Sequence, residues 1–300
     1  MPKCRICNAS ESKQSLRAEN VFGGREEHNF WECENCGVVY LFPYLSKEEE
    51  KYFYKKEFEK FMSSRVGDHR DWSNAKQHIK TNQDQVKRRW EFLKEDITQG
   101  KTLLEIGCSS GFMLDEFKSK GVSCIGVEPS GKFLEFLKEN GHKAYESLDQ
   151  LVKNEKDMKF DIICHFFVFE HIAEPFEFLK SNYEMLNDGG IIIAEIPSST
   201  DALTKIYDIP AFEKFYWSIA HHYYYNPQSL KYIMNELGYR YEIIAEQRYD
   251  LSNHITWMTN GKPGGQGRFS HLSEETIASY KQDLIDSWNC DTVFLKIYKD

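Results

Sequence analysis

The sequence predicts an α/β protein with a doubly wound, mostly parallel sheet, preceded by a small metal-binding ribbon. After residue 98, short and nearly continuous apolar runs alternate with helical patterns, as strands covered on both faces of a parallel sheet require. Two C-x-x-C pairs stand near the N-terminus. These features divide the chain into a zinc-binding ribbon at 1–45, a helical linker or lid at 46–98 and an α/β domain at 99–300, with a substrate-side insertion at 250–290.

The composition is that of a folded, acidic protein. The 300 residues are 41% hydrophobic and 15% aromatic, so the chain can bury enough apolar surface to offset its conformational entropy. The formal net charge of -9 repels polyanions, which makes extended nucleic acid a disfavoured partner. The N-terminus lacks the apolar run of a secretory signal, and no stretch approaches the length of a membrane span. We therefore expect a cytoplasmic protein.

The first four cysteines are predicted to bind one structural zinc ion. Cys4 and Cys7 form one knuckle and Cys33 and Cys36 the other, with the spacing that turns neighbouring thiolates toward a tetrahedral ion. Four thiolates leave no coordination position for water, so this zinc would hold shape. The alternative is a redox dithiol, but no thioredoxin-like pattern surrounds either pair. The other four are expected to be buried small apolar side chains: Cys108, Cys124, Cys164 and Cys290.

The elements of the ribbon follow from turn and strand signals. Residues 16–31 are predicted to form a hairpin around Gly23-Gly24, which accommodates the long spacing between the cysteine pairs. The run at 38–43 is strand-like and stops at a proline. The highly charged stretch at 46–60 carries scattered aromatic residues, a pattern that suits a surface helix laid on the body of the protein.

A second helix is predicted over residues 74–97. Its apolar side chains recur at spacings of three, four and seven and form one stripe: Ile79, Val86, Trp90, Leu93 and Ile97. The basic run Lys87-Arg88-Arg89 on this helix is a candidate phosphate or RNA patch. A solvated helix face is the favoured interpretation of that run.

The α/β domain contains the predicted parallel strands and the helices between them. The four central strands are expected at 103–106, 124–127, 160–164 and 191–196. Helical patterns separate them around residues 113–117, 133–137 and 176–186. Two late strands are predicted at 241–246 and 292–298, with a helix at 273–287. Residues 251–268 are rich in glycine and polar side chains. Within them, residues 253–257 together with 261–265 are predicted to be a mobile lid or a plain surface loop.

The loop after the first strand of this domain is the predicted ligand site, because ligands of open parallel sheets bind beyond the carboxyl ends of the strands. Small residues from Gly107 to Gly111 let the backbone approach a ligand. A nicotinamide dinucleotide is excluded, because its loop would require glycine where Phe112 stands. The carboxylate of Glu105 favours a cationic amino-acid group, and Glu128, after the second strand, can accept both hydroxyls of a ribose.

These residues together resemble motifs I and II of the class I S-adenosylmethionine-dependent methyltransferases. Serine at position 109 replaces the usual central glycine of motif I. The resemblance implies a Rossmann-like sheet of seven strands, S-adenosylmethionine as cofactor and S-adenosylhomocysteine as product. It places Glu105 near the methionine amine, Glu128 on the ribose and Phe166 beside the cofactor. The implied cofactor contacts are Glu105, Gly107, Cys108, Ser109, Gly111, Glu128, Pro129, Ser147 and Phe166.

Further segments resemble one branch of that family, whose members often methylate sugars or natural-product precursors. Residues 160–163 and 169–175 are similar to the segment around its fourth strand, and residues 186–197 are similar to its fifth. The double knuckle that runs into residues 37–43 resembles the zinc-binding prefix of the branch. The resemblance covers most of residues 4–246.

The candidate catalytic residues follow the fourth and fifth strands. Transfer to a hydroxyl requires a base, and histidine suits that role near neutral pH. Relatives in the resembled branch carry an acidic residue and then a histidine, so His222 matches and His221 departs. His222 is therefore the preferred base or substrate ligand, with His221 second; the alternative for both is a packed histidine. Glu170 and His171 would lie near the methyl group by analogy, or else cap a helix and bond the loop backbone.

The sequence thus predicts a small-molecule methyltransferase whose preferred acceptor is a hydroxyl of a sugar, possibly nucleotide-linked, or of a related metabolite. The first alternative is an RNA base methyltransferase, because some of those enzymes also begin with a zinc knuckle. The second is a noncatalytic protein that binds the cofactor or docks partners through its zinc module. The acceptor's identity, the atom methylated and the oligomeric state do not follow from the sequence.

Overall fold

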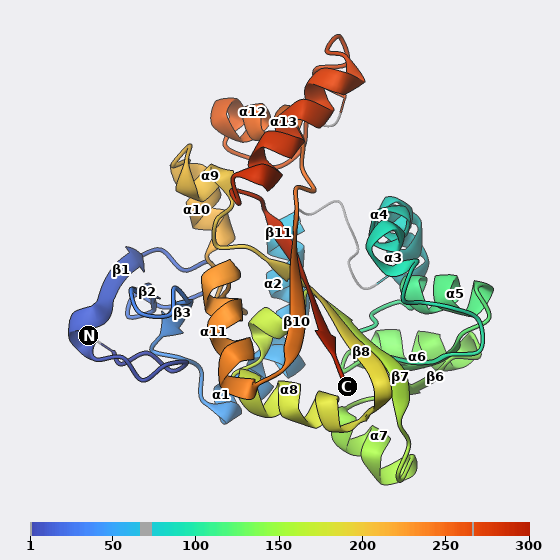
Figure 1. Cartoon of the computed structure of the whole chain (residues 1–300). Helices are drawn as coiled ribbons and strands as arrows, with labels where there is room; N and C mark the ends of the chain where they lie inside the picture. Colours follow the sequence, from blue (N-terminus) through green and yellow to red (C-terminus); the bar gives the residue numbers. More distant parts are fainter. Residues whose placement is uncertain (1, 67–73, 266) are drawn as a thin grey trace.

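The molecule is built around a seven-stranded sheet with the strand order β10-β11-β8-β7-β4-β5-β6. The computed structural model describes residues 2–66, 74–265 and 267–300 (Figure 1). Within the sheet, β11 pairs antiparallel with both of its neighbours, and the pairs among β8, β7, β4, β5 and β6 are parallel. The strands are β4 (Thr102–Ile106), β5 (Ser123–Val127), β6 (Lys143–Tyr145), β7 (Phe160–Phe166), β8 (Leu186–Pro197), β10 (Arg240–Glu246) and β11 (Thr292–Tyr298). This mixed, mostly parallel sheet confirms the predicted fold class.

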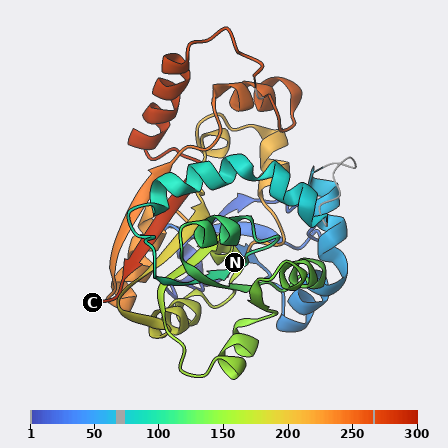
Figure 2. The ribbon, with the colours of Figure 1, turned by 90° about the vertical axis from the view of Figure 1, so that its right-hand side faces the viewer.

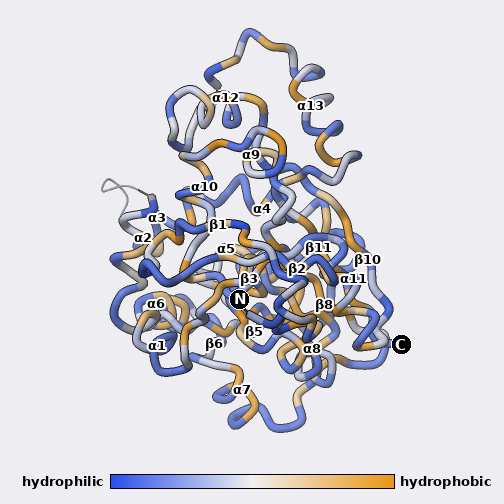
Figure 3. Tube along the Cα trace, turned by 90° about the vertical axis from the view of Figure 1, so that its left-hand side faces the viewer, coloured by the Kyte–Doolittle hydropathy of each residue, from blue (hydrophilic) through white to orange (hydrophobic). Residues whose placement is uncertain are grey.

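Helices cover both faces of the sheet, because its central strands are apolar on both sides. On β8, Ile191 and Ile193 belong to one core cluster, while Ile192 and Ala194 belong to another. The first face is covered by α4 (Gln83–Leu93), α5 (Phe112–Ser119) and α6 (Gly131–Glu139). The second face is covered by α7 (Leu148–Asn154), α8 (Pro175–Glu184) and α11 (Pro227–Leu237). Figure 3 shows apolar segments gathered along the strands between these layers.

A second, smaller sheet lies at the N-terminal end and is antiparallel throughout. Its order is β1-β2-β3-β9, with β1 (Gln14–Ala18), β2 (Asn29–Cys33), β3 (Val39–Phe42) and β9 (Tyr223–Tyr224). The pairing of Leu16 with Trp31 confirms the predicted hairpin. The last strand, β9, comes from the α/β half of the chain and pairs with β3. The two halves of the molecule are therefore joined by backbone hydrogen bonds.

The helical segment between the sheets is more broken than predicted. In place of one helix at 46–60, the chain forms α1 (Lys47–Tyr52), a π-helix η2 (Phe53–Glu57) and α2 (Phe58–Val66). The predicted helix over 74–97 is α3 (Ala75–Thr81) followed by α4, which ends at Leu93. The break falls at Asn82, whose side-chain amide donates to the His78 carbonyl and competes with the helical backbone. Residues 67–73 of the predicted linker lie outside the described residues.

The plain-loop alternative for residues 253–257 is wrong, and the lid stays a prediction. Residues Leu251–Asn260 form helix α12, which Asp250 caps by accepting a hydrogen bond from the Asn253 backbone. Tertiary packing stabilises this helix, because Trp257 is buried with its ring 5.0 Å from that of Phe212. Figure 1 shows α12 and α13 (Glu274–Asp286) projecting together from one end of the sheet.

Four further short helices of the described residues precede β1, follow β7 or lie between β8 and β9. They are η1 (Glu11–Lys13), η3 (Phe169–His171), α9 (Ala202–Lys205) and α10 (Pro210–Tyr216). Within the described ranges, no helix combines the length and the apolar character that crossing a bilayer requires.

Candidate active site

The loop that joins β4 to α5 is shaped by positive φ angles. Gly107 and Gly111 have φ of 74° and 82°, and Ser109 has φ of 46°. A Cβ at Gly107 would lie 2.6 Å from Val168 Cγ2, and one at Gly111 would lie 2.6 Å from Leu137 Cδ2. Both positions therefore require glycine for space as well as for conformation. The loop presents bare backbone at the carboxyl end of β4, as the sequence predicted.

Glu105 ends β4 beneath this loop and is 3% exposed. Its Oε2 is buried and has no hydrogen-bond partner among the described residues. Burial raises the pKa of the carboxyl to about 8, against the opposing effect of the Arg89 charge. A buried carboxylate without a partner is costly, and a ligand cation would relieve that cost. Glu105 thus fits the ammonium group that the cofactor carries.

Glu128, directly after β5, links the loop between β4 and α5 to the loop between β5 and α6. Its Oε2 accepts a hydrogen bond of 2.7 Å from the Ser109 backbone, and its Oε1 accepts one of 2.8 Å from the Ser130 backbone. Burial raises the pKa of this carboxyl to about 7, although both backbone hydrogen bonds lower it. Each carboxylate oxygen has a further lone pair for a ribose hydroxyl. The neighbouring Pro129 is exposed.

The other predicted cofactor residues have mixed surroundings. Phe166 ends β7, and the Arg89 guanidinium lies 4.4 Å from its ring. The Ser147 side chain caps α7 by accepting a hydrogen bond from the Gln150 backbone. Cys108 is buried, and its Sγ lies 2.5 Å from where a Cβ of Gly126 would stand. The contacts of these residues with the cofactor stay predictions.

Helix α3 contributes a residue that the sequence analysis missed. The His78 Nδ1 lies 2.8 Å from the Ser110 Oγ in the loop at residues 107–111, which we call the glycine loop. The His78 ring lies 5.3 Å from the ring of Phe133. Figure 2 shows α3 and α4 as a teal ribbon running past the sheet. His78 carries no local signal, because its contact depends on how a distant helix folds over the loop.

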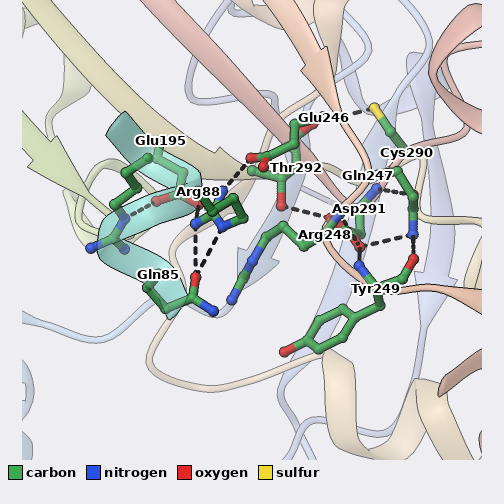
Figure 4. A network of polar contacts seen from close by, with 11 residues as sticks. Gln85, Arg88, Glu195, Glu246, Gln247, Arg248, Tyr249, Cys290, Asp291 and Thr292 are labelled. Carbon is green, nitrogen blue, oxygen red and sulfur yellow. Dashed lines mark hydrogen bonds and ion pairs between the residues drawn. The ribbon is translucent and has the colours of Figure 1, made fainter. Parts of the chain in front are cut away.

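The prediction of a solvated face for Lys87-Arg88-Arg89 is wrong for both arginines. Arg88 forms ion pairs with Glu195 and Glu246, and the Arg89 Nε donates to Glu195 at 2.6 Å (Figure 4). Glu195 is fully buried on β8, and the charges of Arg89 and Arg88 lower its pKa although burial opposes them. Buried carboxylates on the sheet therefore draw this side of α4 inward, and only Lys87 remains in solvent.

Another buried carboxyl with an unpartnered oxygen lies beyond β7, at Glu170 in η3. The side chain is 1% exposed, its Oε2 has no partner among the described residues, and burial raises its pKa to about 8. His171 follows it. The His171 Nδ1 lies 2.7 Å from the Ala220 carbonyl, which leaves Nε2, 3.9 Å from Glu170 Oε1, free of a proton. Burial lowers the pKa of His171 to about 4, so the ring is neutral at pH 7.

The structure brings His221 and His222 to the same cluster. The rings of His171 and His221 lie 4.6 Å apart, and burial lowers the pKa of His221 well below its ordinary value. The His222 Nε2 lies 3.7 Å from Glu50 Oε1 on α1, and its backbone bonds Glu170 on one side and Leu41 on the other. We call Glu170, His171, His221 and His222 the histidine cluster.

The predicted metal ligands also converge. The Sγ atoms of Cys4 and Cys36 lie 3.7 Å apart, and those of Cys7 and Cys33 lie 3.6 Å apart. Four thiolates around a tetrahedral zinc at about 2.3 Å would lie about 3.8 Å from one another. The Cys4 thiol and burial raise the pKa of Cys36, so four thiolates need a cation in their midst. The geometry and the donor set both fit a metal.

The fold and the glycine loop between two acidic strand ends define an enzyme that binds an adenosyl cofactor. A family model for the methyltransferase domain matches residues 75–243, more than half of the chain, and the chain belongs to that family. It is an S-adenosylmethionine-dependent methyltransferase.

The most similar curated relatives match only part of the chain. A ubiquinone biosynthesis O-methyltransferase of Nitrobacter winogradskyi is 36% identical over 99 residues, which are 32% of this chain and 38% of that protein. The protein of the same name from Bradyrhizobium sp. is 29% identical over 98 residues, 31% of this chain and 39% of that protein. The chain thus spans about two fifths of the length of these relatives.

Among solved structures, a SAM-dependent methyltransferase from Archaeoglobus fulgidus has 22% sequence identity and a TM-score of 0.50. The match covers 72% of this chain and 94% of that one. At this identity, the likeness shows a shared fold.

Proposed function

We propose that this methyltransferase acts on a hydroxyl of a small molecule, with a sugar or nucleotide-linked sugar as the preferred acceptor. The observation that carries the proposal is the histidine cluster at the carboxyl end of β7, which offers neutral imidazoles to an acceptor proton. The partial similarity to O-methyltransferases supports transfer to oxygen. The resemblance to a sugar-methylating branch is what favours a sugar.

The chain's own residues hold the two reactants. S-adenosylmethionine, when bound, supplies a methyl group on a positively charged sulfur. Glu105 accepts hydrogen bonds from the amino-acid end of the cofactor, Glu128 accepts them from the ribose, and the glycine loop leaves room for both. In this proposal the acceptor hydroxyl lies against the histidine cluster, whose first two members are in η3.

His171 is the base that the geometry favours over the other histidines. Its Nδ1 hydrogen bond to the Ala220 carbonyl fixes the tautomer, so Nε2 carries the lone pair. Its side chain is 23% exposed, whereas that of His222 is 3% exposed. His171 therefore takes the hydroxyl proton on Nε2. Glu170 Oε1 lies 3.9 Å from that nitrogen and stabilises the imidazolium where the carboxyl is ionised, which its raised pKa of about 8 favours at alkaline pH. His222 and His221, which the sequence analysis ranked first and second as base or substrate ligand, are acceptor ligands in this proposal.

Cys4, Cys7, Cys33 and Cys36 hold a structural zinc ion in this proposal. All four ligands are thiolates, so the metal has no open position for chemistry. It fixes the N-terminal sheet, and β3 of that sheet carries β9, directly after His221 and His222.

The test is a transfer assay with purified protein, S-adenosylmethionine, and panels of nucleotide sugars and phenolic hydroxyls, read as a mass gain of one methyl group. We expect a product in one panel and a rate at least 100-fold lower for His171→Ala, since a general base contributes about that much or more. His222→Ala is the matched comparison. Binding of S-adenosylhomocysteine without transfer to any hydroxyl, with an undiminished rate for His171→Ala on another acceptor, would refute the proposal.

RNA base methylation remains the alternative to test. It predicts RNA binding that persists at 200 mM salt, which a net charge of -9 opposes. A filter-binding titration against salt decides between the two.

A further inference from the structure

Among the described residues, two arginines near the histidine cluster form no ion pair with a carboxylate. Arg65 lies in the last turn of α2, and Arg248 follows β10. The Arg248 Nε is buried and makes no hydrogen bond within the described part of the chain. The contacts of both guanidinium groups are with aromatic rings: Arg65 Cζ lies 4.6 Å from the Phe215 ring, and Arg248 Cζ lies 4.5 Å from the Phe167 ring.

The nearby carboxylates are already engaged by other donors. Glu195 and Glu246 pair with Arg88, and Glu195 also pairs with Arg89. Asp291 accepts hydrogen bonds of 2.8 to 3.1 Å from the backbone of Arg248 and Tyr249 and from the side chains of Gln247 and Thr292. Figure 4 shows the Arg248 side chain extended away from Asp291, with no dashed contact at its guanidinium group. Arg248 is thus the unpaired cation of this network.

Both arginines act electrostatically on Glu170 of the histidine cluster, and Arg248 also contacts the end of β7. Phe167, under Arg248, directly follows Phe166 at the end of β7 and precedes Glu170 in η3. Burial raises the pKa of Glu170, and the charges of Arg65 and Arg248 both oppose that rise, so both guanidinium groups lie within electrostatic reach of this carboxyl. They approach it from two elements that are far apart in the sequence.

We propose that Arg65 and Arg248 bind an oxyanion of the methyl acceptor, a phosphate or a carboxylate group, while its hydroxyl faces the histidine cluster. This inference rests on the proposed function. A guanidinium group presents a planar fork of donors that matches either oxyanion, and it gains most where water is excluded. A partly buried cation without a partner is costly to the free protein, and an anionic ligand would relieve that cost. The acceptor is therefore an anionic molecule.

The test uses the full-length protein saturated with S-adenosylhomocysteine, so that the cofactor's own carboxylate is already bound. Thermal melting is followed during titration with sodium pyrophosphate, with sodium succinate, and with sodium chloride at matched ionic strength. We expect at least one of the two anions to raise the melting temperature above the chloride blank. Pyrophosphate alone would identify a phosphate-bearing acceptor, and succinate alone would identify a carboxylate-bearing one.

Variants assign the effect to the two arginines. Arg248→Gln and Arg65→Gln should each weaken anion binding at least tenfold, and Arg248→Lys should weaken it less, because it keeps the charge and loses the fork. Arg240→Gln is the matched control, because Arg240 is exposed and pairs with Asp300 at the surface. It should bind the anion as the wild type does. If Arg248→Gln does not fold, Arg65→Gln carries the test.

Three outcomes would overturn the inference. They are no anion effect above the chloride blank, unchanged anion affinity in both glutamine variants, and a tenfold loss of S-adenosylhomocysteine affinity in Arg248→Gln. The last would assign this guanidinium to the cofactor's carboxylate instead. Failure of the wild type to methylate any hydroxyl, with the anion effect intact, would count against the proposed function alone.

Discussion

The site has a cofactor end around Glu105 and an acceptor end around Glu170, and the two ends have a similar central group with differently assembled surroundings. Each is centred on a buried carboxyl with an unpaired oxygen, Glu105 in one and Glu170 in the other, and burial raises the pKa of both to about 8. Around Glu105, the partners come from one short loop and the end of the next strand. Around Glu170, they come from α1, α2, η3, the segment before β9 and the segment after β10. The first arrangement is local in sequence, and the second is assembled by the fold.

The two ends also differ in how the N-terminal sheet supports them. Strand β3 pairs with β9, and the Leu41 backbone donates to the His222 carbonyl at 3.0 Å, so this sheet supports the histidine cluster. The loop at Gly107 and the carboxyl of Glu105 lie in the seven-stranded sheet, supported by β5 and β7. The proposed zinc ion is thus linked to the acceptor end by backbone hydrogen bonds, and to β4 only through shared apolar packing.

The largest expected effect comes from breaking the metal cluster. Cys36→Ser, or removal of the metal with a strong chelator, should lower the transfer rate at least 100-fold and leave S-adenosylhomocysteine affinity within about twofold, because structural zinc sites contribute directly to folding. Isothermal titration and the transfer assay measure the two quantities. Cys124→Ser is the control, because the Cys124 Sγ donates to the Val122 carbonyl and a hydroxyl can do the same. A parallel loss of cofactor affinity would mean that the two ends are not separable.

The next effect compares the two carboxyls directly. Glu105→Gln should weaken S-adenosylhomocysteine binding by about 10- to 100-fold, since a hydrogen bond to a charged group contributes roughly 1.5 to 3 kcal/mol. Glu170→Gln should leave that affinity unchanged and slow the transfer step. Calorimetric titration of both variants, each checked for folding by circular dichroism, makes the comparison. Equal losses of affinity in the two variants would contradict the division into two ends.

The same contrast explains how far the sequence could predict the structure. Glu105, Gly107, Gly111 and Glu128 lie on consecutive elements, so their spacing in the sequence already predicts that they come together. The folded loop has the open glycine backbone that this spacing predicted. The cysteine pairs likewise meet across a short hairpin. The mostly parallel, seven-stranded character of the large sheet was predicted from the apolar runs together with the family resemblance, and its strand order comes from the structure.

What the sequence could not predict depends on contacts between distant segments. Arg88 and Arg89 look like a solvated basic run until Glu195 and Glu246, more than 100 residues away, are placed beneath α4. Residues 251–260 look like a loop because their helix propensity is weak, and the burial of Trp257 decides their conformation. The roles of His78 and Arg248 also rest on such contacts. The domain boundaries at 45 and 98 stay predictions.

A smaller effect is a proton released when the cofactor end is filled. In the free protein the raised pKa keeps the Glu105 carboxyl mostly protonated at pH 7, and a bound ammonium group favours the ionised form. Binding of S-adenosylhomocysteine at pH 7 should therefore release about one proton from Glu105, and the affinity should rise up to about tenfold from pH 6.5 to 7.5. Calorimetry in buffers of different ionisation enthalpy measures the release. Because Glu128 also titrates near this range, the informative quantity is the release that Glu105→Gln removes.

The smallest expected effect is on stability, and it distinguishes the ends by their response to ligand. A carboxyl whose pKa is raised in the folded state favours folding when protonated, and that contribution is lost as pH rises from about 4.5 through the raised value, here about 8. At pH 8.5, Glu170→Gln and Glu105→Gln should each raise the melting temperature of the ligand-free protein by a few degrees, with little change at pH 5. Exposed Glu139→Gln is the control. Saturation with S-adenosylhomocysteine should cancel the gain of Glu105→Gln over the wild type, because the wild-type Glu105 carboxylate then has a cationic partner. The gain of Glu170→Gln should persist. Cancellation in both variants would place the two carboxyls around a single ligand.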